Sequence, residues 1–198
     1  MKKTIWRPFV LGTILGAMNF FSSAVHWIIP IGKAGAIGPH EIFATLSAAL
    51  GGPSGLLVTS LLHTLGAHIY LMPRSQELDT QILLNSIGDF VARTLALLAV
   101  AYCYRFLHQR AQKAITFLAG WILIVFVYYT LLLPMQALDW AIFLPGYLSL
   151  FTLVQGAPPE LLTVAIVTTL IWIALPARYR RPLWIEVQPA SPPAEGMG

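Results

Sequence analysis

Residues 114–135 read AITFLAGWILIVFVYYTLLLPM, a stretch without a single charged side chain. An α-helix advances about 1.5 Å per residue and the hydrocarbon core of a membrane is about 30 Å thick, so crossing it takes about 20 consecutive apolar residues. This stretch therefore predicts a membrane-spanning helix, and the remainder of the chain is interpreted around it.

The composition of the whole chain also indicates a membrane protein. Of its 198 residues, 57% are hydrophobic and only 10% are charged, whereas a soluble domain carries about 25% charged residues. A soluble enzyme, a nucleic-acid-binding domain and a secreted disulfide scaffold are therefore excluded. The formal net charge of +4 fits basic residues that flank membrane spans better than a nucleic-acid partner. The single cysteine, Cys103, cannot form an internal disulfide.

Six segments of the chain have the apolarity of membrane spans. They cover residues 5–29, 36–50, 54–72, 81–107, 114–135 and 159–176. A further apolar stretch, residues 138–154, is interrupted by Pro145-Gly146, a pair that marks a break in regular structure. We therefore predict an all-α fold: a polytopic membrane helix bundle with about six transmembrane helices and one re-entrant or interfacial segment at 138–154.

The basic residues indicate how this bundle is oriented. They gather before the first span, between the fourth and fifth spans, and after the sixth. The members are Lys2, Lys3, Arg7, Arg105, Arg110, Lys113, Arg178, Arg180 and Arg181. Because cytoplasmic loops carry an excess of Lys and Arg, we expect both termini in the cytoplasm and the chain in the inner (plasma) membrane. The alternative is an odd number of spans, in which the stretch 138–154 also crosses.

The same interpretation divides the chain into two parts. Residues 1–184 form the membrane domain, and its surroundings are the lipid bilayer. Residues 185–198 are rich in proline and small residues and are expected to form a disordered cytoplasmic tail.

Several ionisable side chains fall inside the expected spans, where a charge costs about 2.5–3.5 kcal/mol at the bilayer centre. With the orientation above, they gather in the outer half of the bundle. Asn85, Asp89 and Arg93 follow one another at intervals of four residues and so share one helix face. We predict an outer-half pocket for a small extracytoplasmic ligand. Its candidate lining residues are His40, Glu41, His68, Asp89 and Arg93.

These polar residues also have structural interpretations. Asp89 and Arg93 can pair along one helix, and His68 can lie at the membrane interface. His63 is expected to be a helix-packing residue. Glu41 is the hardest to explain in this way, because it has no partner in its own helix.

No motif in the chain indicates catalysis, a cofactor or a metal. The stretch 52–55, Gly-Pro-Ser-Gly, fits the pattern of intramembrane serine proteases, but such a serine needs a base within hydrogen-bond reach. The only histidine after His68 is His108, at the expected cytoplasmic boundary. We interpret the stretch as a tight turn in which Pro53 opens the next helix. The histidine spacing matches no zinc signature, and we expect no enzymatic activity.

Part of the chain carries a family resemblance. Residues 36–39 read AIGP, residues 50–57 read LGGPSGLL, and an apolar helix with His63 and His68 follows. Over about 35 residues this succession resembles the core of the LytS-type five-transmembrane sensor family. Its glycines let a hairpin close tightly, and its proline starts a helix. The resemblance implies a sensor domain that binds a small ligand or senses the envelope and is read by a signalling output protein.

Two alternatives stay open. The Gly-Pro-x-Gly turn, the stretch 88–105 that ends in Tyr-Arg, and the small pair Gly12/Gly16 resemble the substrate-binding components of energy-coupling-factor transporters. That resemblance implies a vitamin or micronutrient pocket and an ATPase module as partner. The other alternative is a structural subunit of a larger membrane complex. In all cases, Gly12/Gly16 and Ala44/Ala48 are expected to allow close helix packing.

Overall fold

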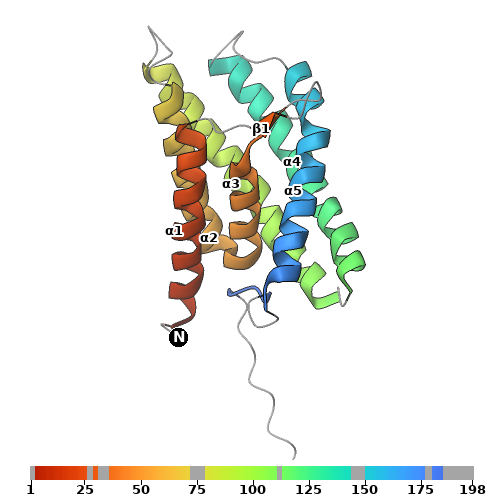
Figure 1. Cartoon of the computed structure of the whole chain (residues 1–198). Helices are drawn as coiled ribbons and strands as arrows, with labels where there is room; N and C mark the ends of the chain where they lie inside the picture. The colour runs from red at the N-terminus through yellow and green to blue at the C-terminus, as the bar shows by residue number, and fades with distance from the viewer. Residues whose placement is uncertain are drawn as a thin grey trace, which may run out of the picture.

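The computed structural model describes residues 3–25, 29–30, 36–71, 79–110, 113–143, 150–176 and 180–184. Within these ranges the chain forms an all-helical bundle with one short ribbon (Figure 1). The helices are α1 (Lys3–Ala24), α2 (Pro39–Leu71), α3 (Asp79–Arg110), α4 (Ala114–Phe143) and α5 (Leu150–Ala174). The ribbon consists of β1 (Ile29–Pro30) paired antiparallel with β2 (Ala36–Ile37). The expected all-α class is confirmed.

Three of the described helices are long and apolar enough to cross a membrane. They are Pro39–Tyr70 within α2, Thr80–Arg110 within α3, and Ala114–Phe143 within α4. Large apolar side chains such as Leu57, Leu61 and Leu65 face outward from the bundle, an arrangement that soluble proteins rarely show over continuous areas. The structure therefore supports a membrane protein. Three such helices are fewer than the six spans expected, and the course of α2 accounts for part of the difference.

Helix α2 folds back on itself at Gly52. Thr59 Oγ1 donates a hydrogen bond of 2.7 Å to Ser47 Oγ, twelve residues away in sequence, whereas a straight helix would separate these residues by about 18 Å. Gly52 has φ 59° and ψ −150°, a conformation that is essentially restricted to glycine. The tight turn predicted from sequence is confirmed, with Pro53 after it. We call residues 39–51 the first half of α2 and residues 53–71 its second half.

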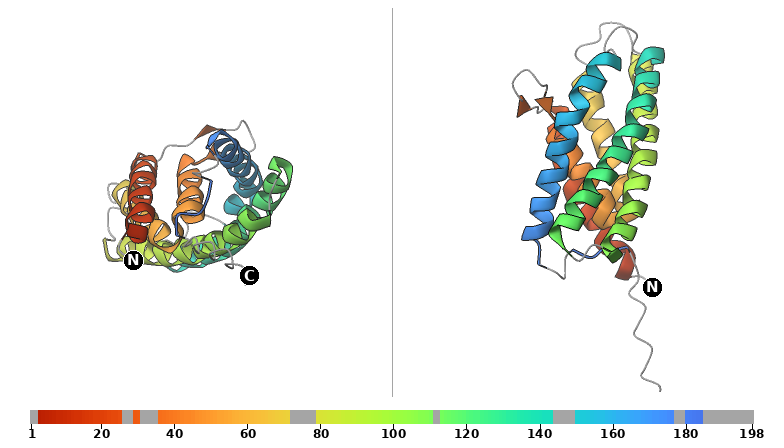
Figure 2. Two further views of the ribbon diagram at one scale, coloured as in Figure 1. Left: turned by 90° about the horizontal axis from the view of Figure 1, so that it is seen from below. Right: turned by 90° about the vertical axis from the view of Figure 1, so that its right-hand side faces the viewer.

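The first half of α2 is short and central. At about 1.5 Å per residue it is roughly 20 Å long, less than the thickness of about 30 Å that a full span must cover. Ala44 and Ala48 on this half are completely buried. The left view of Figure 2 shows the half inside the curve formed by the other helices. Because protein rather than lipid surrounds it, polar side chains can be accommodated there.

Helix α1 lies along the second half of α2 through glycine contacts. A Cβ placed on Gly12 would lie 2.6 Å from the Cα of Gly55, and one on Gly16 would lie 3.3 Å from the Cα of Thr59. Only small residues allow two helices to approach this closely. The expected packing role of Gly12/Gly16 is confirmed, and it is fulfilled within the chain.

The stretch 138–154 is not a separate re-entrant or interfacial segment, so that expectation is wrong. Residues 138–143 continue α4, and residues 150–154 belong to α5. Leu138 and Ile142 are both more than half exposed and extend the apolar outer face of α4. Hydropathy does not distinguish such an extension from a new element, because both are equally apolar. Pro145-Gly146 lies outside the described residues.

Residues 180–184, which we call the C-terminal strap, lie against the turn of α2. The backbone N–H of Leu183 donates to the carbonyl of Leu50 over 2.8 Å, and the indole N–H of Trp184 donates to the carbonyl of Ala49 over 3.5 Å. The last four carbonyls of a helix have no partner within the helix, so the strap caps the first half of α2. The Tyr104 hydroxyl fixes the strap by donating to the carbonyl of Arg180 over 3.1 Å.

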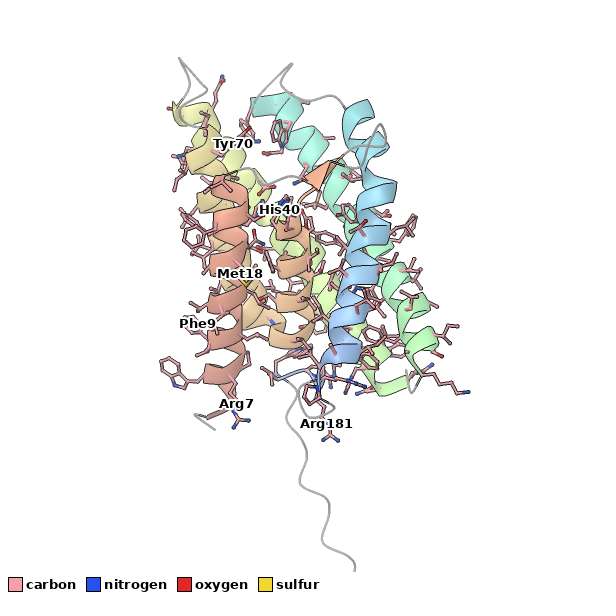
Figure 3. The ribbon with its side chains drawn as sticks, in the orientation of Figure 1. Arg7, Phe9, Met18, His40, Tyr70 and Arg181 are labelled. Carbon is pink, nitrogen blue, oxygen red and sulfur yellow. The ribbon has the colours of Figure 1, made fainter. Side chains whose placement is uncertain are left out.

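Both ends of the described chain lie at one end of the bundle. Arg7 and Arg181 are at this end, whereas Tyr70 is at the opposite end (Figure 3). The expected tail, residues 185–198, lies outside the described residues.

Gly52→Ala should destabilise the fold. Alanine is strained in this backbone conformation by about 1–3 kcal/mol, and its Cβ would lie 2.2 Å from the Trp184 ring. We expect a lower thermal unfolding midpoint for the detergent-purified protein. Gly51→Ala is the matched control, because a Cβ there meets only the Pro8 carbonyl at 3.3 Å and Ser47 Oγ at 3.9 Å. Equal midpoints for the two variants would contradict the role assigned to Gly52.

Candidate functional site

Polar side chains from five helix segments meet inside the bundle, and one of them, His40, lies in the half that holds Tyr70 (Figure 3). They come from α1, both halves of α2, α3 and α4. We call them the polar cluster. Its members are Asn19, Ser23, His40, Glu41, His63, Asp89, Arg93, Tyr128 and Gln136.

A triangle of three side chains forms the most buried part of the cluster. Arg93 Nη1 donates to Glu41 Oε1 over 2.7 Å and to the Tyr128 hydroxyl over 3.0 Å. The Tyr128 hydroxyl in turn donates to Glu41 Oε2 over 2.5 Å. The Arg93 side chain is only 3% exposed. A charge at this depth is tolerated only when it is paired and hydrogen-bonded, and both carboxylate oxygens of Glu41 serve that purpose.

Asp89 forms a second, looser centre beside the triangle. Gln136 Nε2 donates to Asp89 Oδ1 over 2.9 Å. The other carboxylate oxygen, Oδ2, lies 3.6 Å from Arg93 Nε and 3.8 Å from His63 Nε2, which is beyond hydrogen-bond distance. Asp89 Oδ2 and Arg93 Nε are therefore buried atoms without a hydrogen-bond partner among the described residues. Such atoms leave hydrogen-bonding capacity for a further molecule.

Asn19 of α1 orients His63. The Asn19 amide nitrogen donates to the carbonyl of His40 over 3.0 Å, so its oxygen faces the other way, 2.8 Å from His63 Nδ1. Because that oxygen is an acceptor, we assign the proton of the imidazole to Nδ1. Ser23 Oγ lies 2.8 Å from the same nitrogen and donates to the Asn19 oxygen. His63 Nε2 is thus turned toward Asp89.

The charged side chains and His40 differ in how far they are exposed. The Arg93 side chain is 3% exposed, Asp89 is 13% exposed, and His40, which lies 3.4 Å from Glu41, is 23% exposed. Figure 3 places His40 in the half of the bundle that holds Tyr70. The cluster is therefore most accessible from the end opposite Arg7 and Arg181.

The structure brings four of the five predicted lining residues together. His40, Glu41, Asp89 and Arg93 belong to the cluster, and the partner that Glu41 lacks in its own helix is Arg93 of α3. The predicted pairing of Asp89 with Arg93 is present at 3.6 Å, but Glu41 is the closer partner. His68 is separate from these contacts, with its Nδ1 at 2.8 Å from Ser86 Oγ.

Sequence analysis missed several members of the cluster. His63 was expected to be a helix-packing residue; it does join α2 to α1 through Asn19, and its ring also lies 5.0 Å from the ring of His40 in the cluster. Asn19 and Ser23 are four residues apart, and Tyr128 and Gln136 are eight apart, so each pair shares a helix face. That polar periodicity is the signal that could have identified them.

The structure also places the serine of the Gly-Pro-Ser-Gly stretch and the potential metal ligands among the described residues. Ser54 Oγ donates to the Gly51 carbonyl at 3.4 Å, as in a turn. Across the described ranges, no group of three or more His, Cys, Asp or Glu side chains is placed to hold a metal ion.

Comparison of the chain with protein-family models, with curated proteins and with solved structures finds no match. The polar cluster is therefore the feature of the chain that indicates a function. A group of hydrogen-bonded charges with unused donors and acceptors can bind a small polar molecule, whereas a fully satisfied network would only join helices.

Glu41 and Arg93 should depend on each other for stability. Removal of one partner leaves a buried charge uncompensated and costs about 3–5 kcal/mol. We therefore expect Glu41→Gln and Arg93→Met each to lower the unfolding midpoint strongly, and the double variant to recover part of the loss. His68→Gln, a change at a histidine outside the cluster, should have a small effect. Additive losses in the double variant would show that the pair is not coupled.

Proposed function

We propose that the chain is a sensor-like membrane domain that binds a small ligand from the extracytoplasmic side and is read by a separate partner chain. In this proposal the membrane domain has six helical segments in the inner membrane and both termini in the cytoplasm. The second half of α2 is a full span, and its short first half is a segment enclosed by the other helices. The basic residues near Arg7 and Arg181 support that orientation. With this orientation, the more accessible side of the polar cluster faces the extracytoplasmic side of the membrane.

The observation that carries the proposal is the unsatisfied centre around Asp89. Ionisable residues inside a membrane domain are costly and therefore point to function by default. The Glu41–Arg93–Tyr128 triangle can be explained as structural, because each charge in it is paired. Asp89 Oδ2 and Arg93 Nε are not satisfied in this way, and they lie beside the more exposed edge of the cluster.

The first half of α2 offers a route from the ligand to the cytoplasm. It carries His40 and Glu41 at one end, and at the other end the carbonyls of Ala49 and Leu50 bind the C-terminal strap. A short helix moves as a rigid body, because its internal hydrogen bonds resist bending. A shift of Glu41 on ligand binding would thus loosen or tighten the strap, which is where a signalling partner would detect it.

The transporter alternative has less support from the packing. A substrate-binding component would use its small-residue face to couple to another membrane protein, but Gly12 and Gly16 already lie against Gly55 and Thr59 of the same chain. The structural-subunit alternative predicts that the polar cluster has no ligand.

The proposed route predicts a link between Glu41 and the accessibility of the strap. In a Cys103→Ser background, Leu183→Cys should react slowly with a membrane-impermeant maleimide applied to inside-out vesicles. Glu41→Gln should raise the rate about tenfold, equivalent to about 1.4 kcal/mol of lost docking. His68→Gln is the matched control and should leave the rate unchanged. Equal rates with and without Glu41→Gln would eliminate the route through α2.

Partner identity distinguishes the three functions. The protein would be purified in mild detergent from its native host, and co-purifying chains would be identified by mass spectrometry. We expect a kinase, cyclase or response protein that is lost when the strap is disrupted by Trp184→Ala. Two ATPases with a coupling membrane protein would instead establish the transporter. A complex whose assembly is lost in variants of the polar cluster, without any effect on small-molecule binding, would favour a structural subunit.

A further inference from the structure

The orientation of His63 limits which ligand the polar cluster can take. With the proton on Nδ1, a neutral imidazole presents Nε2 as a hydrogen-bond acceptor. This atom faces Asp89 Oδ2, also an acceptor, across 3.8 Å. Two acceptors that face each other repel, and a donor placed within about 3 Å of both would turn the repulsion into two hydrogen bonds.

The charges around this position favour a positive donor. Arg93 lies 2.7 Å from Glu41 and 3.6 Å from Asp89, so two carboxylates share one guanidinium. Asp139 of α4 adds a further buried carboxyl group, with Asn85 Nδ2 donating to Asp139 Oδ2. The carboxyl groups in this part of the described bundle therefore outnumber the guanidinium of Arg93. In surroundings of low polarity such an excess is strongly unfavourable until a positive charge compensates it.

We infer that the position between His63 Nε2 and Asp89 Oδ2 binds a small cation that carries N–H donors, the head of a primary amine. The inference rests on the proposed function, in that it takes the polar cluster to be a ligand site. One ammonium nitrogen can donate to both acceptors at once and also compensates Asp89. An anion would be repelled by the carboxylates. A quaternary ammonium would bring charge without donors, and a neutral solute would bring donors without charge.

The experiment uses the full chain in lipid nanodiscs at constant ionic strength and pH. Methylammonium chloride is the probe, and tetramethylammonium chloride and sodium chloride are the matched salts. Thermal unfolding is followed by tryptophan fluorescence, because a ligand that binds only the folded state raises the unfolding midpoint in a saturable way. We expect methylammonium alone to raise the midpoint saturably.

Variants assign the effect to the two acceptors. Asp89→Asn should abolish the methylammonium-induced rise of the unfolding midpoint. His63→Leu removes the Nε2 acceptor and should weaken the apparent affinity for methylammonium at least tenfold. His68→Gln should retain the full shift. If Asp89→Asn does not fold, His63→Leu still tests the assigned position, and the comparison of the three salts still tests the ligand class.

The outcomes separate this inference from the proposed function. An equal shift with tetramethylammonium, or no shift with any cation, overturns the inferred ligand class. A methylammonium shift that persists in both variants overturns the assigned position. The proposed function is tested independently by strap accessibility, which would still respond to Glu41→Gln if the ligand were of another class.

Discussion

The buried ion pair between Arg93 and Glu41 constrains the rest of the structure. A guanidinium does not lose its proton in proteins, so Arg93 requires a carboxylate close by once α3 is embedded in the bundle. Glu41 can reach it only if the first half of α2 occupies the centre of the molecule. The first half of α2 does not continue as a straight helix from this central position. The chain reverses direction at Gly52. The reversal exposes the carbonyl end of the first half, which the C-terminal strap then caps.

The bundle is apolar on its outer surface as well as in its core, which distinguishes it from a soluble protein. Leucines and other large apolar side chains cover its outside, while amide, hydroxyl and charged groups meet inside. Helices do not associate through a hydrophobic driving force where lipid surrounds them, so close packing and hydrogen bonds take over. The glycines of α1 provide close packing, as Gly12 does against Gly55. Thr59 provides a hydrogen bond between helices, because its hydroxyl donates to the Gly12 carbonyl.

The polar cluster and the C-terminal strap contact opposite ends of the first half of α2. At the accessible end, the cluster keeps acceptors that its own donors do not satisfy, as between His63 and Asp89. At the other end, the carbonyls of Ala49 and Leu50 depend on a remote part of the chain for their hydrogen bonds. A change at the first end can reach the second without large rearrangement of the outer helices. This arrangement is the basis of the proposed function, in which a ligand bound on one side of the membrane is reported on the other.

The sequence by itself determined the membrane class, the approximate places of α1, α2 and α3, and the glycine turn, because hydropathy, glycine and proline act locally. It also placed Asp89 and Arg93 on one face, since helical periodicity needs no partner. Only the tertiary structure decided that Arg93 pairs with Glu41, that His63 joins the cluster and that His68 does not. Those contacts join residues of different helix segments, and their geometry depends on how the segments pack. For the same reason, apolarity alone could not show that residues 138–143 extend α4.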